Sequence, residues 1–535
     1  MYRITNQELL DYLNRISKTK TDYEIRHELY SFYLVPATSI FVTSSLPEDV
    51  FDDIVLDCNF YRQVDEILAN TDNVTTKIYL YSVIISATKN SAYTNRFAEE
   101  IIEWDLPFEL KYFLQWQLGA KMFRYPIMKA KFEVLYKLTK SIYDLADSKL
   151  TKEYTFIPYE QRNHDFVVVI ISQLLGYNHG PSQHALDHCY AIIKGMGKKL
   201  LLINTAEFSL GTYMTWFHQL MVPSYVKEYN DYKYYEYKDI KIPFFQCEYD
   251  MPNLPEIEMI LDLIRNRKPE FVLEIGTGSI VAALCEKMVP VLTNGTMHNQ
   301  IECSHTKYQT LARKPQKDEL IFLEPLGIGE NNIIESMFTT EVRPKSAIIT
   351  RDVLKVPNDA FVIATVGTRL GLEITEDLLD IMADTVEINN KIYYVFFGEF
   401  DRFESVISKY DAVRNHFVYF GKTNDIISCL EQCNLYLNPY RIGGGMSSIE
   451  AMAVGLPAVS TSYGDGGVVV GEDFWVETVH DYKDKIIEYA ADSDYYYAQA
   501  NIALARGKYL QNSQEVFCDT IRLFLDRVAR DEGRI

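Results

Sequence analysis

The sequence has little of what several large classes of protein require. Its 53 basic and 74 acidic residues give a net charge of −21, which argues against a nucleic acid bound through its phosphates. The longest apolar runs, such as residues 166–171, have the length of a strand and fall far short of a membrane span. The first residues are polar and lack the apolar run of a signal peptide. We therefore expect a cytoplasmic protein.

Clustered cysteines are also missing. The eight cysteines are scattered, and the closely spaced pair Cys429 and Cys433 has no companion ligands in the surrounding sequence. Burial in a helix explains this pair better than metal binding does. We expect neither a metal nor a resident cofactor.

Residues 1–160 are poor in glycine and proline. Apolar side chains recur there at helical spacing, for example in 97–104 and 127–138. The pattern predicts a helical region without chemistry of its own. Its expected role is packing, or docking of a protein partner or a membrane surface.

From residue 161 onward the pattern becomes that of strands alternating with helices. Residues 166–171 form a continuous apolar run, typical of a parallel strand covered on both faces, and the loop that follows contains His179. A later strand ends at Asn294 and is followed by His298. A histidine beyond a strand is either a catalytic base or a structural residue. We name His298 and His179 as candidate bases, should the reaction need one, and His305 as a weaker candidate for a histidine in the cleft.

Residues 434–463, NLYLNPYRIGGGMSSIEAMAVGLPAVSTSY, contain the clearest motif. They predict a buried strand, a loop of three glycines, a helix opening near Ser447 and a second strand. In an open parallel sheet a ligand lies beyond the carboxyl ends of the strands, so this loop predicts a site where backbone amides bind a phosphate. Glu450 has two readings of about equal weight: it accepts hydrogen bonds from a ribose diol, or it closes a capping box with Ser447.

Another strand is predicted earlier in the chain, at residues 361–367, and Thr375 is predicted to cap the helix that follows it. Arg369 follows this strand and would direct its fork of donors toward the glycine loop. The alternative for Arg369 is a surface ion pair. A further strand ends at Gly421. Thr423, beyond this strand, either contacts a nucleotide base or caps the next helix.

The segment IGGGMSSIEAMAVGLPAVS resembles the donor-nucleotide segment of the GT-B glycosyltransferases. The resemblance implies that Glu450 binds the donor ribose and that the loop binds the diphosphate. The donor-binding residues that it implies are Gly367, Thr368, Arg369, Gly421, Thr423, Gly443, Gly444, Gly445, Met446, Ser447 and Glu450. The sequence departs from the family pattern in two places: Ile442 replaces the first Glu of the usual Glu-x7-Glu pair, and Ile374 replaces a phosphate-binding Lys.

The fold class that the resemblance implies is α/β, namely GT-B, with two Rossmann-like domains facing a cleft. We expect the helical region at 1–160, the acceptor-side domain at 161–345 and the nucleotide-sugar domain at 346–535. The last helix would brace the two domains.

The expected activity is metal-independent hexosyl transfer from a nucleotide sugar, expected to be a UDP-sugar, to a glycan, lipid-linked glycan or protein. It would serve polysaccharide biosynthesis or protein glycosylation. Two alternatives stay open. One is a non-catalytic GT-B-like partner protein, favoured by Ile442 and Ile374. The other is a methyltransferase using S-adenosylmethionine, favoured by VLEIGTGS at residues 272–279.

Overall fold

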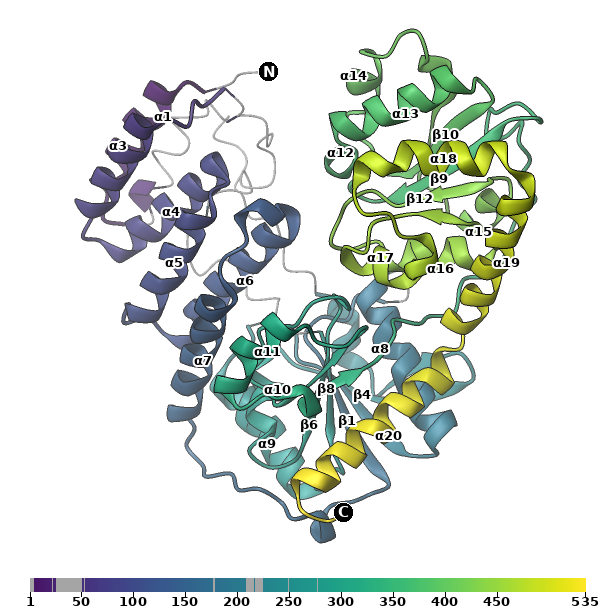
Figure 1. The fold of residues 1–535 in the computed structure, drawn as a ribbon. Helices are drawn as coiled ribbons and strands as arrows, with labels where there is room; N and C mark the ends of the chain where they lie inside the picture. Colours follow the sequence, from purple (N-terminus) through teal and green to yellow (C-terminus); the bar gives the residue numbers. More distant parts are fainter. Residues whose placement is uncertain are drawn as a thin grey trace.

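The computed structural model describes residues 4–21, 23–25, 51, 53–176, 179–207, 216, 225–248, 250–276 and 278–535. It contains a helical region followed by two domains, each built on a parallel sheet (Figure 1). The fold is therefore the α/β architecture with two Rossmann-like domains that the sequence predicts.

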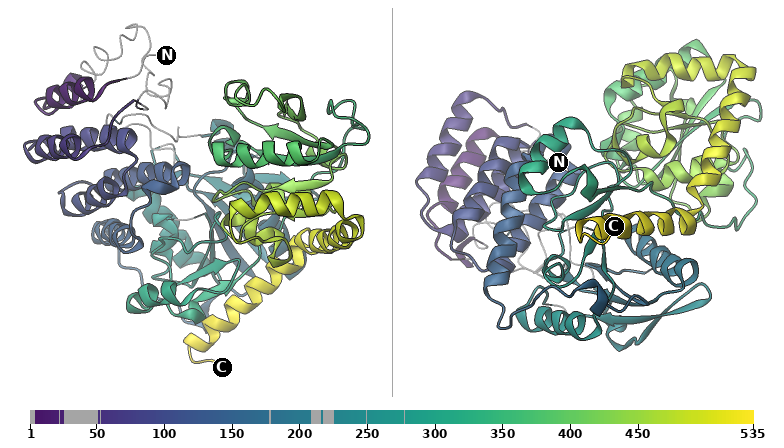
Figure 2. Two further views of the ribbon diagram at one scale, coloured as in Figure 1. Left: turned by 45° about the horizontal axis from the view of Figure 1, so that its top comes forward. Right: turned by 60° about the horizontal axis from the view of Figure 1, so that its bottom comes forward.

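The described part of the N-terminal region is helical. Thr5 and Glu8 form a capping box at the start of its first helix. Its α-helices are α1 (Asn6–Ile16), α3 (Cys58–Ala69), α4 (Val74–Thr88), α5 (Ser91–Glu103), α6 (Phe108–Arg124) and α7 (Phe132–Ser148). One continuous apolar core joins these helices to Val168 and Ile170 of the first sheet. The helical region is thus joined to the first domain, with α7 packed against the helix at residues 280–285, and Figure 2 shows it beside that domain from two further sides.

The first sheet has eight strands in the order β3-β4-β2-β1-β5-β6-β7-β8, all parallel except for the β3–β4 pair at one edge. The strands are β1 (Phe166–Ile171), β2 (Lys199–Asn204), β3 (Tyr234–Tyr237), β4 (Ile240–Gln246), β5 (Val272–Ile275), β6 (Val291–Asn294), β7 (Tyr308–Leu311) and β8 (Ile333–Glu335). The helices of this domain are α8 (Gly180–Tyr190), α9 (Leu254–Arg267), α10 (Ile280–Cys285) and α11 (Lys317–Leu323).

Alternate residues of β1 face opposite layers. Val168 and Ile170 belong to the core that includes α9, α10 and the N-terminal helices, whereas Val167 and Val169 belong to the core beneath α8 and the last helix of the chain. This two-sided burial explains why the strand is apolar without alternation.

The second sheet has five parallel strands in the order β11-β10-β9-β12-β13. They are β9 (Phe361–Gly367), β10 (Ile392–Gly398), β11 (Phe417–Gly421), β12 (Leu435–Leu437) and β13 (Ala458–Val459). Its helices are α12 (Leu370–Glu373), α13 (Glu376–Ile388), α14 (Phe403–Ile407), α15 (Ile426–Leu430), α16 (Gly445–Ala453), α17 (Gly464–Val470), α18 (Tyr482–Ala491) and α19 (Ser493–Leu510). Thr375 caps α13, as predicted.

The C-terminal end of the chain returns from the second domain to the first. Helix α20 (Ser513–Asp531) packs Phe517, Ile521 and Phe524 into the core of the first sheet, while α19 packs on α16 of the second domain. Both views in Figure 2 show α20, in yellow, lying along the first domain. The last two helices therefore connect the two domains.

Candidate functional site

The second sheet has a switch point at its centre. Numbered in chain order, its strands run 3-2-1-4-5, so the connections leave β9 and β12 in opposite directions. Such a divergence opens a ligand site beyond the carboxyl ends of the two strands. Gly367, Thr368 and Arg369 lie at the end of β9, and the glycine loop follows β12. The fold thus brings the two predicted donor-binding segments together.

The glycine loop ends at a helix N-terminus. Gly444 is the N-cap of α16, with a left-handed φ of 96°, and the helix begins at Gly445, two residues before the predicted start. In the described part of the chain no protein acceptor takes the amide protons of Gly445, Met446 and Ser447. Three free amides at the positive end of a helix dipole form an anion site.

The capping-box reading of Ser447 and Glu450 is wrong. The cap of α16 is Gly444, which has no side chain to make a capping bond, and Glu450 lies well inside the helix. Ser447 donates its hydroxyl to the Gly444 carbonyl at 3.0 Å and also contacts the hydroxyl of Tyr436 at 2.9 Å. This hydroxyl therefore braces the loop from inside.

Arg441 is the central residue that the sequence pattern did not reveal. Its buried guanidinium pairs with Glu373 at 2.8 Å and donates to Asn438, to the Val366 carbonyl and to Ser447. A Cβ on Gly444 would lie 2.5 Å from its Nε, so the loop can pass over this guanidinium only as glycine. Its place two residues before three glycines was the available signal.

Arg369 faces the same loop from the end of β9. Its guanidinium pairs with Glu373 at 3.1 Å and would lie 3.5 Å from a Cβ on Gly443. Glu373 therefore holds two guanidiniums, one buried beneath the loop and one partly exposed beside it. Two positive charges and one negative charge leave a net positive charge where the amides point.

Glu450 lies on α16, and no hydrogen bond or ion pair to its carboxylate is found in the described ranges. Burial raises the pKa of this carboxyl to about 7, and the charge of Arg343 opposes the rise only in part. The side chain of Glu450 is half-buried, so part of it stays accessible.

The other residues predicted to bind the donor nucleotide lie at strand ends, in a turn and on α16. Thr368 is exposed at the end of β9, and Met446 is half-buried against the core of the second domain. Gly421 has a positive φ of 85°, and the Thr423 hydroxyl accepts the Asp425 amide proton at 3.1 Å. Thr423 thus shapes the turn before α15, and the capping reading of Thr423 is wrong, because the N-cap of that helix is Asp425. Ile374 is a core residue and supplies no charge.

His298 lies in a buried cluster of histidines. Its ring stacks on Phe338 with centroids 4.1 Å apart and meets the His184 ring at 5.2 Å. Burial holds the pKa of His298 well below its usual range, so the ring is neutral at pH 7. A cavity with room for about one water molecule lies among His184, His188 and His298.

His179 is placed differently. It is the N-cap residue of α8, beyond the end of β1, and its Nδ1 lies 2.8 Å from the Ser182 hydroxyl. Burial lowers its pKa. His305, the weaker candidate, stacks on Tyr143 of the helical region at 3.7 Å.

Asp465, on α17, joins the two sheet domains. It accepts the amide protons of His298 at 2.7 Å and Asn299 at 3.0 Å. A Cβ on Gly445 would lie 3.3 Å from the Cβ of Asp465 and 2.9 Å from the Phe338 ring. The loop bearing His298 is therefore fastened beside the start of α16.

The described residues of the methyltransferase-like motif at 272–279 have a structural role. Residues 272–275 form the inner strand β5, and Thr277 lies outside the described residues. Glu274 accepts hydrogen bonds from the Ser279 amide at 2.8 Å and the Thr293 hydroxyl at 2.6 Å. Both carboxylate oxygens are thus used within the domain.

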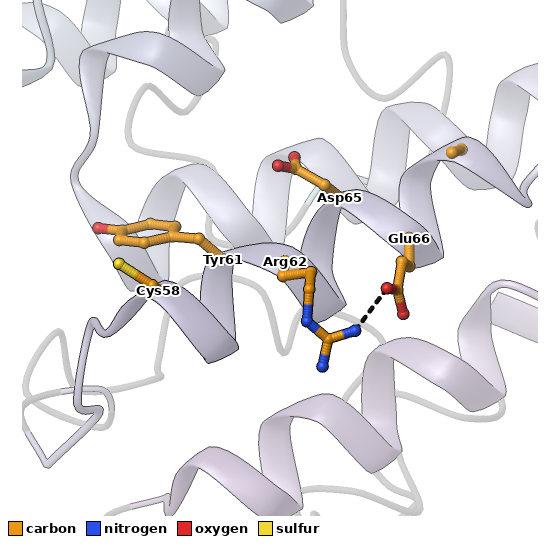
Figure 3. Close-up of a pocket in the computed structure, with 6 residues that line it drawn as sticks. Cys58, Tyr61, Arg62, Asp65 and Glu66 are labelled. Atoms are coloured by element: carbon orange, nitrogen blue, oxygen red, sulfur yellow. Dashed lines mark hydrogen bonds and ion pairs between the residues drawn. The ribbon is translucent and has the colours of Figure 1, made fainter.

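A separate shallow hollow lies on α3. Figure 3 shows Cys58, Tyr61, Arg62, Asp65 and Glu66 along this single helix, with Arg62 and Glu66 paired at 2.6 Å. It is a helix surface with an ordinary i,i+4 ion pair. Within the described ranges no three His, Cys, Asp or Glu side chains are grouped to hold a metal ion, and every helix is too short or too polar to span a membrane.

Comparison with known proteins agrees with this geometry. Residues 348–503 match the family model of the glycosyl transferases group 1. The match covers less than a third of the chain. The matched segment includes the glycine loop, Arg369 and Glu450, and the match supports glycosyl transfer as an activity.

Comparison with solved structures shows the fold of the chain as a whole. The chain is similar to an O-GlcNAc transferase mutant from Thermobaculum terrenum, with a TM-score of 0.51, 8% identity and 98% of each chain covered. It also aligns with a glycosyltransferase from Rickettsia africae ESF-5 at a TM-score of 0.47 and 13% identity, over 69% of this chain and 99% of that one. A third structure, HepE from Anabaena in complex with UDP, gives a TM-score of 0.44 at 13% identity, over 67% and 99% of the two chains. The fold is GT-B. None of the curated proteins searched matches the sequence.

Proposed function

We propose that the glycosyltransferase domain binds a nucleotide sugar, a UDP-sugar, through its diphosphate and ribose. One observation carries the proposal: unbonded amides at the start of α16 lie beside the Arg369 guanidinium, and Glu450 follows on the same helix. An anion and a diol joined in one molecule satisfy these groups together.

The same groups explain how transfer would be assisted. Breaking the bond between sugar and diphosphate leaves negative charge on the diphosphate. The amides of Gly445 to Ser447 and the Arg369 guanidinium are fixed before the reaction, so they stabilise this charge without reorganising. We propose that this positive charge replaces a divalent metal. Approach of the first domain would exclude water, which otherwise hydrolyses the donor.

The acceptor would enter from the first domain. His179 lies beyond β1 at the switch point of that sheet, between β1 and β5, and its lowered pKa keeps the ring neutral and able to accept a proton at pH 7. His298 is enclosed by Phe338 and His184, so we assign it a positioning role and His179 the role of candidate base. Glycan, lipid-linked glycan and protein acceptors remain the proposed classes, and a cytoplasmic location remains a prediction.

Calorimetric titration with UDP tests the proposal directly. The wild type should bind UDP, and Arg369→Ala and Glu450→Ala should each weaken binding by about 10-fold or more, because each removes a charged hydrogen-bonding group. Arg522→Ala is the matched control, since Arg522 pairs only with Asp519 on the surface of α20. Thermal shifts with UDP, GDP and S-adenosylmethionine identify the ligand class. The proposal would be refuted if the wild type bound neither UDP nor GDP.

The partner-protein alternative is favoured by one observation. Ile374 is part of the core, so the diphosphate site lacks a cation that the family pattern places there. Assays of donor hydrolysis and of transfer separate the two functions. Tight UDP binding without turnover of any nucleotide sugar would indicate a non-catalytic partner, whereas turnover that is lost in Arg369→Ala would indicate the enzyme.

A further inference from the structure

In the described part of the chain, the helical region contacts the candidate donor site through Phe123. Phe123, in the last turn of α6, lies over Arg369, with the guanidinium carbon 4.4 Å from the ring centroid. The two residues are far apart in the sequence and belong to the first and last of the three parts of the chain. Phe123 is 37% exposed, so it is an aromatic ring held at the surface of the site.

The guanidinium of Arg369 is constrained on two sides. Its edge, through Nε and Nη2, faces the Oε1 atom of Glu373 at 3.2 and 3.1 Å, and its flat face is covered by the Phe123 ring. Its Nη2 end lies toward Gly443. A planar cation fixed on one edge and one face has few orientations left, so its Nη2 end stays beside the glycine loop.

Neighbouring contacts hold this end of α6 in place. Lys129, just beyond α6, donates to the Gln300 side chain at 3.1 Å. Gln300 follows Asn299, whose amide proton is accepted by Asp465 of the second domain. The turn between α6 and α7 thus contacts the loop that is fastened beside α16. Three separate parts of the chain meet around Arg369.

We propose that Phe123 is a positioning residue of the donor site, supplied by the helical region to hold Arg369 ready for the diphosphate. The inference rests on the proposed function, because it assigns Arg369 to the diphosphate. The ring attracts the cation, removes water from one of its faces and limits its rotamers, so less freedom is lost when the diphosphate binds. The helical region is then part of the catalytic unit as well as a neighbour of the first domain.

The test is a double-mutant cycle on UDP affinity with full-length protein. Phe123→Ala should weaken binding about 3- to 10-fold, the range expected for a partly desolvated cation–π contact. In the Arg369→Ala background the same substitution should have no further effect, because Phe123 acts only through Arg369. Phe123→Trp should restore most of the affinity, whereas Phe123→Leu, which keeps the apolar bulk, should not.

Phe156→Ala is the matched control. Phe156 also lies over an arginine, Arg162, at 4.8 Å, and this pair is remote from the glycine loop. Its removal should leave UDP affinity unchanged. An equal loss from Phe123→Ala in both backgrounds, full rescue by leucine, or unchanged or tighter UDP binding would each overturn the proposal. Wild-type protein that binds no nucleotide would instead overturn the proposed function, so the two failures are distinguishable.

Discussion

Asp465 accepts the backbone amide proton of His298 at 2.7 Å, so a carboxylate of the second domain holds a loop of the first. The contact is buried, and it lies next to the N-terminus of α16. Burial raises the pKa of Asp465 to about 7, although the amides of His298 and Asn299 favour its charged form. The connection between the domains is therefore sensitive to pH.

Asp465→Asn should make the protein less sensitive to alkaline pH. The folded state holds the Asp465 proton more tightly than the unfolded chain does, so the stability that the protonated form provides is complete below about pH 4 and is lost as pH rises to about 7. An asparagine oxygen still accepts both amide protons and never ionises. The free energy of unfolding of the variant should exceed that of the wild type at pH 8.5 and match it near pH 4.

Asp239→Asn is the control for this prediction. The exposed Asp239 pairs with Lys194, which lowers its pKa, so its substitution should give no gain at pH 8.5. A gain there as large as that of Asp465→Asn would contradict the explanation by burial.

Glu450→Gln should weaken UDP binding and stabilise the folded protein at alkaline pH. With a pKa of about 7, ionisation of Glu450 costs the folded state stability between about pH 4.5 and 7, and glutamine removes this cost. The variant should melt at a higher temperature than the wild type at pH 8.5 and at a similar temperature at pH 4.5.

The same variant tests the ribose contact. A carboxylate is the stronger acceptor for a diol, so wild-type affinity for UDP should fall as pH drops below 7, while that of Glu450→Gln should be weaker and nearly independent of pH between 6 and 8. Titrations at several pH values in that interval measure this. Parallel pH profiles for the two proteins would exclude Glu450 from the site.

Arg441→Met should destabilise the second domain by about 3–5 kcal/mol, because it leaves Glu373 buried without its closest cation and removes donors to Asn438 and Val366. Urea unfolding measures the loss. Arg414→Ala, which breaks the exposed pair with Glu404, should cost less than about 1 kcal/mol. Equal losses for the two variants would show that the network beneath the loop contributes little.

Gly444→Ala should abolish UDP binding. The left-handed φ of 96° disfavours alanine, and the added methyl group would lie 2.5 Å from the Arg441 Nε, so the loop must move. Gly119→Ala is the control, because Gly119 lies inside α6 with nothing within 4 Å of an added Cβ. That change should raise stability by up to about 1 kcal/mol and leave binding intact. Wild-type affinity in Gly444→Ala would show that the amides of this loop do not bind the ligand.

Much of the local structure followed from residue patterns. The apolar run at residues 166–171, the glycine loop before α16 and the Thr375 cap each lie where the sequence predicted them. Strand β8, which pairs with β7, had no recognisable signal in the sequence. Three residues are too few for a strand pattern, and only the neighbouring strand stabilises them.

The sequence by itself determined the alternation of strands and helices and the place of the glycine loop, because side-chain periodicity and backbone freedom are local properties. Only the tertiary structure decided that Glu373 holds both Arg369 and Arg441, that Asp465 fastens His298 and that Phe123 covers Arg369. These contacts join segments that no spacing rule relates, and they form only once two sheets and a helical layer are packed together.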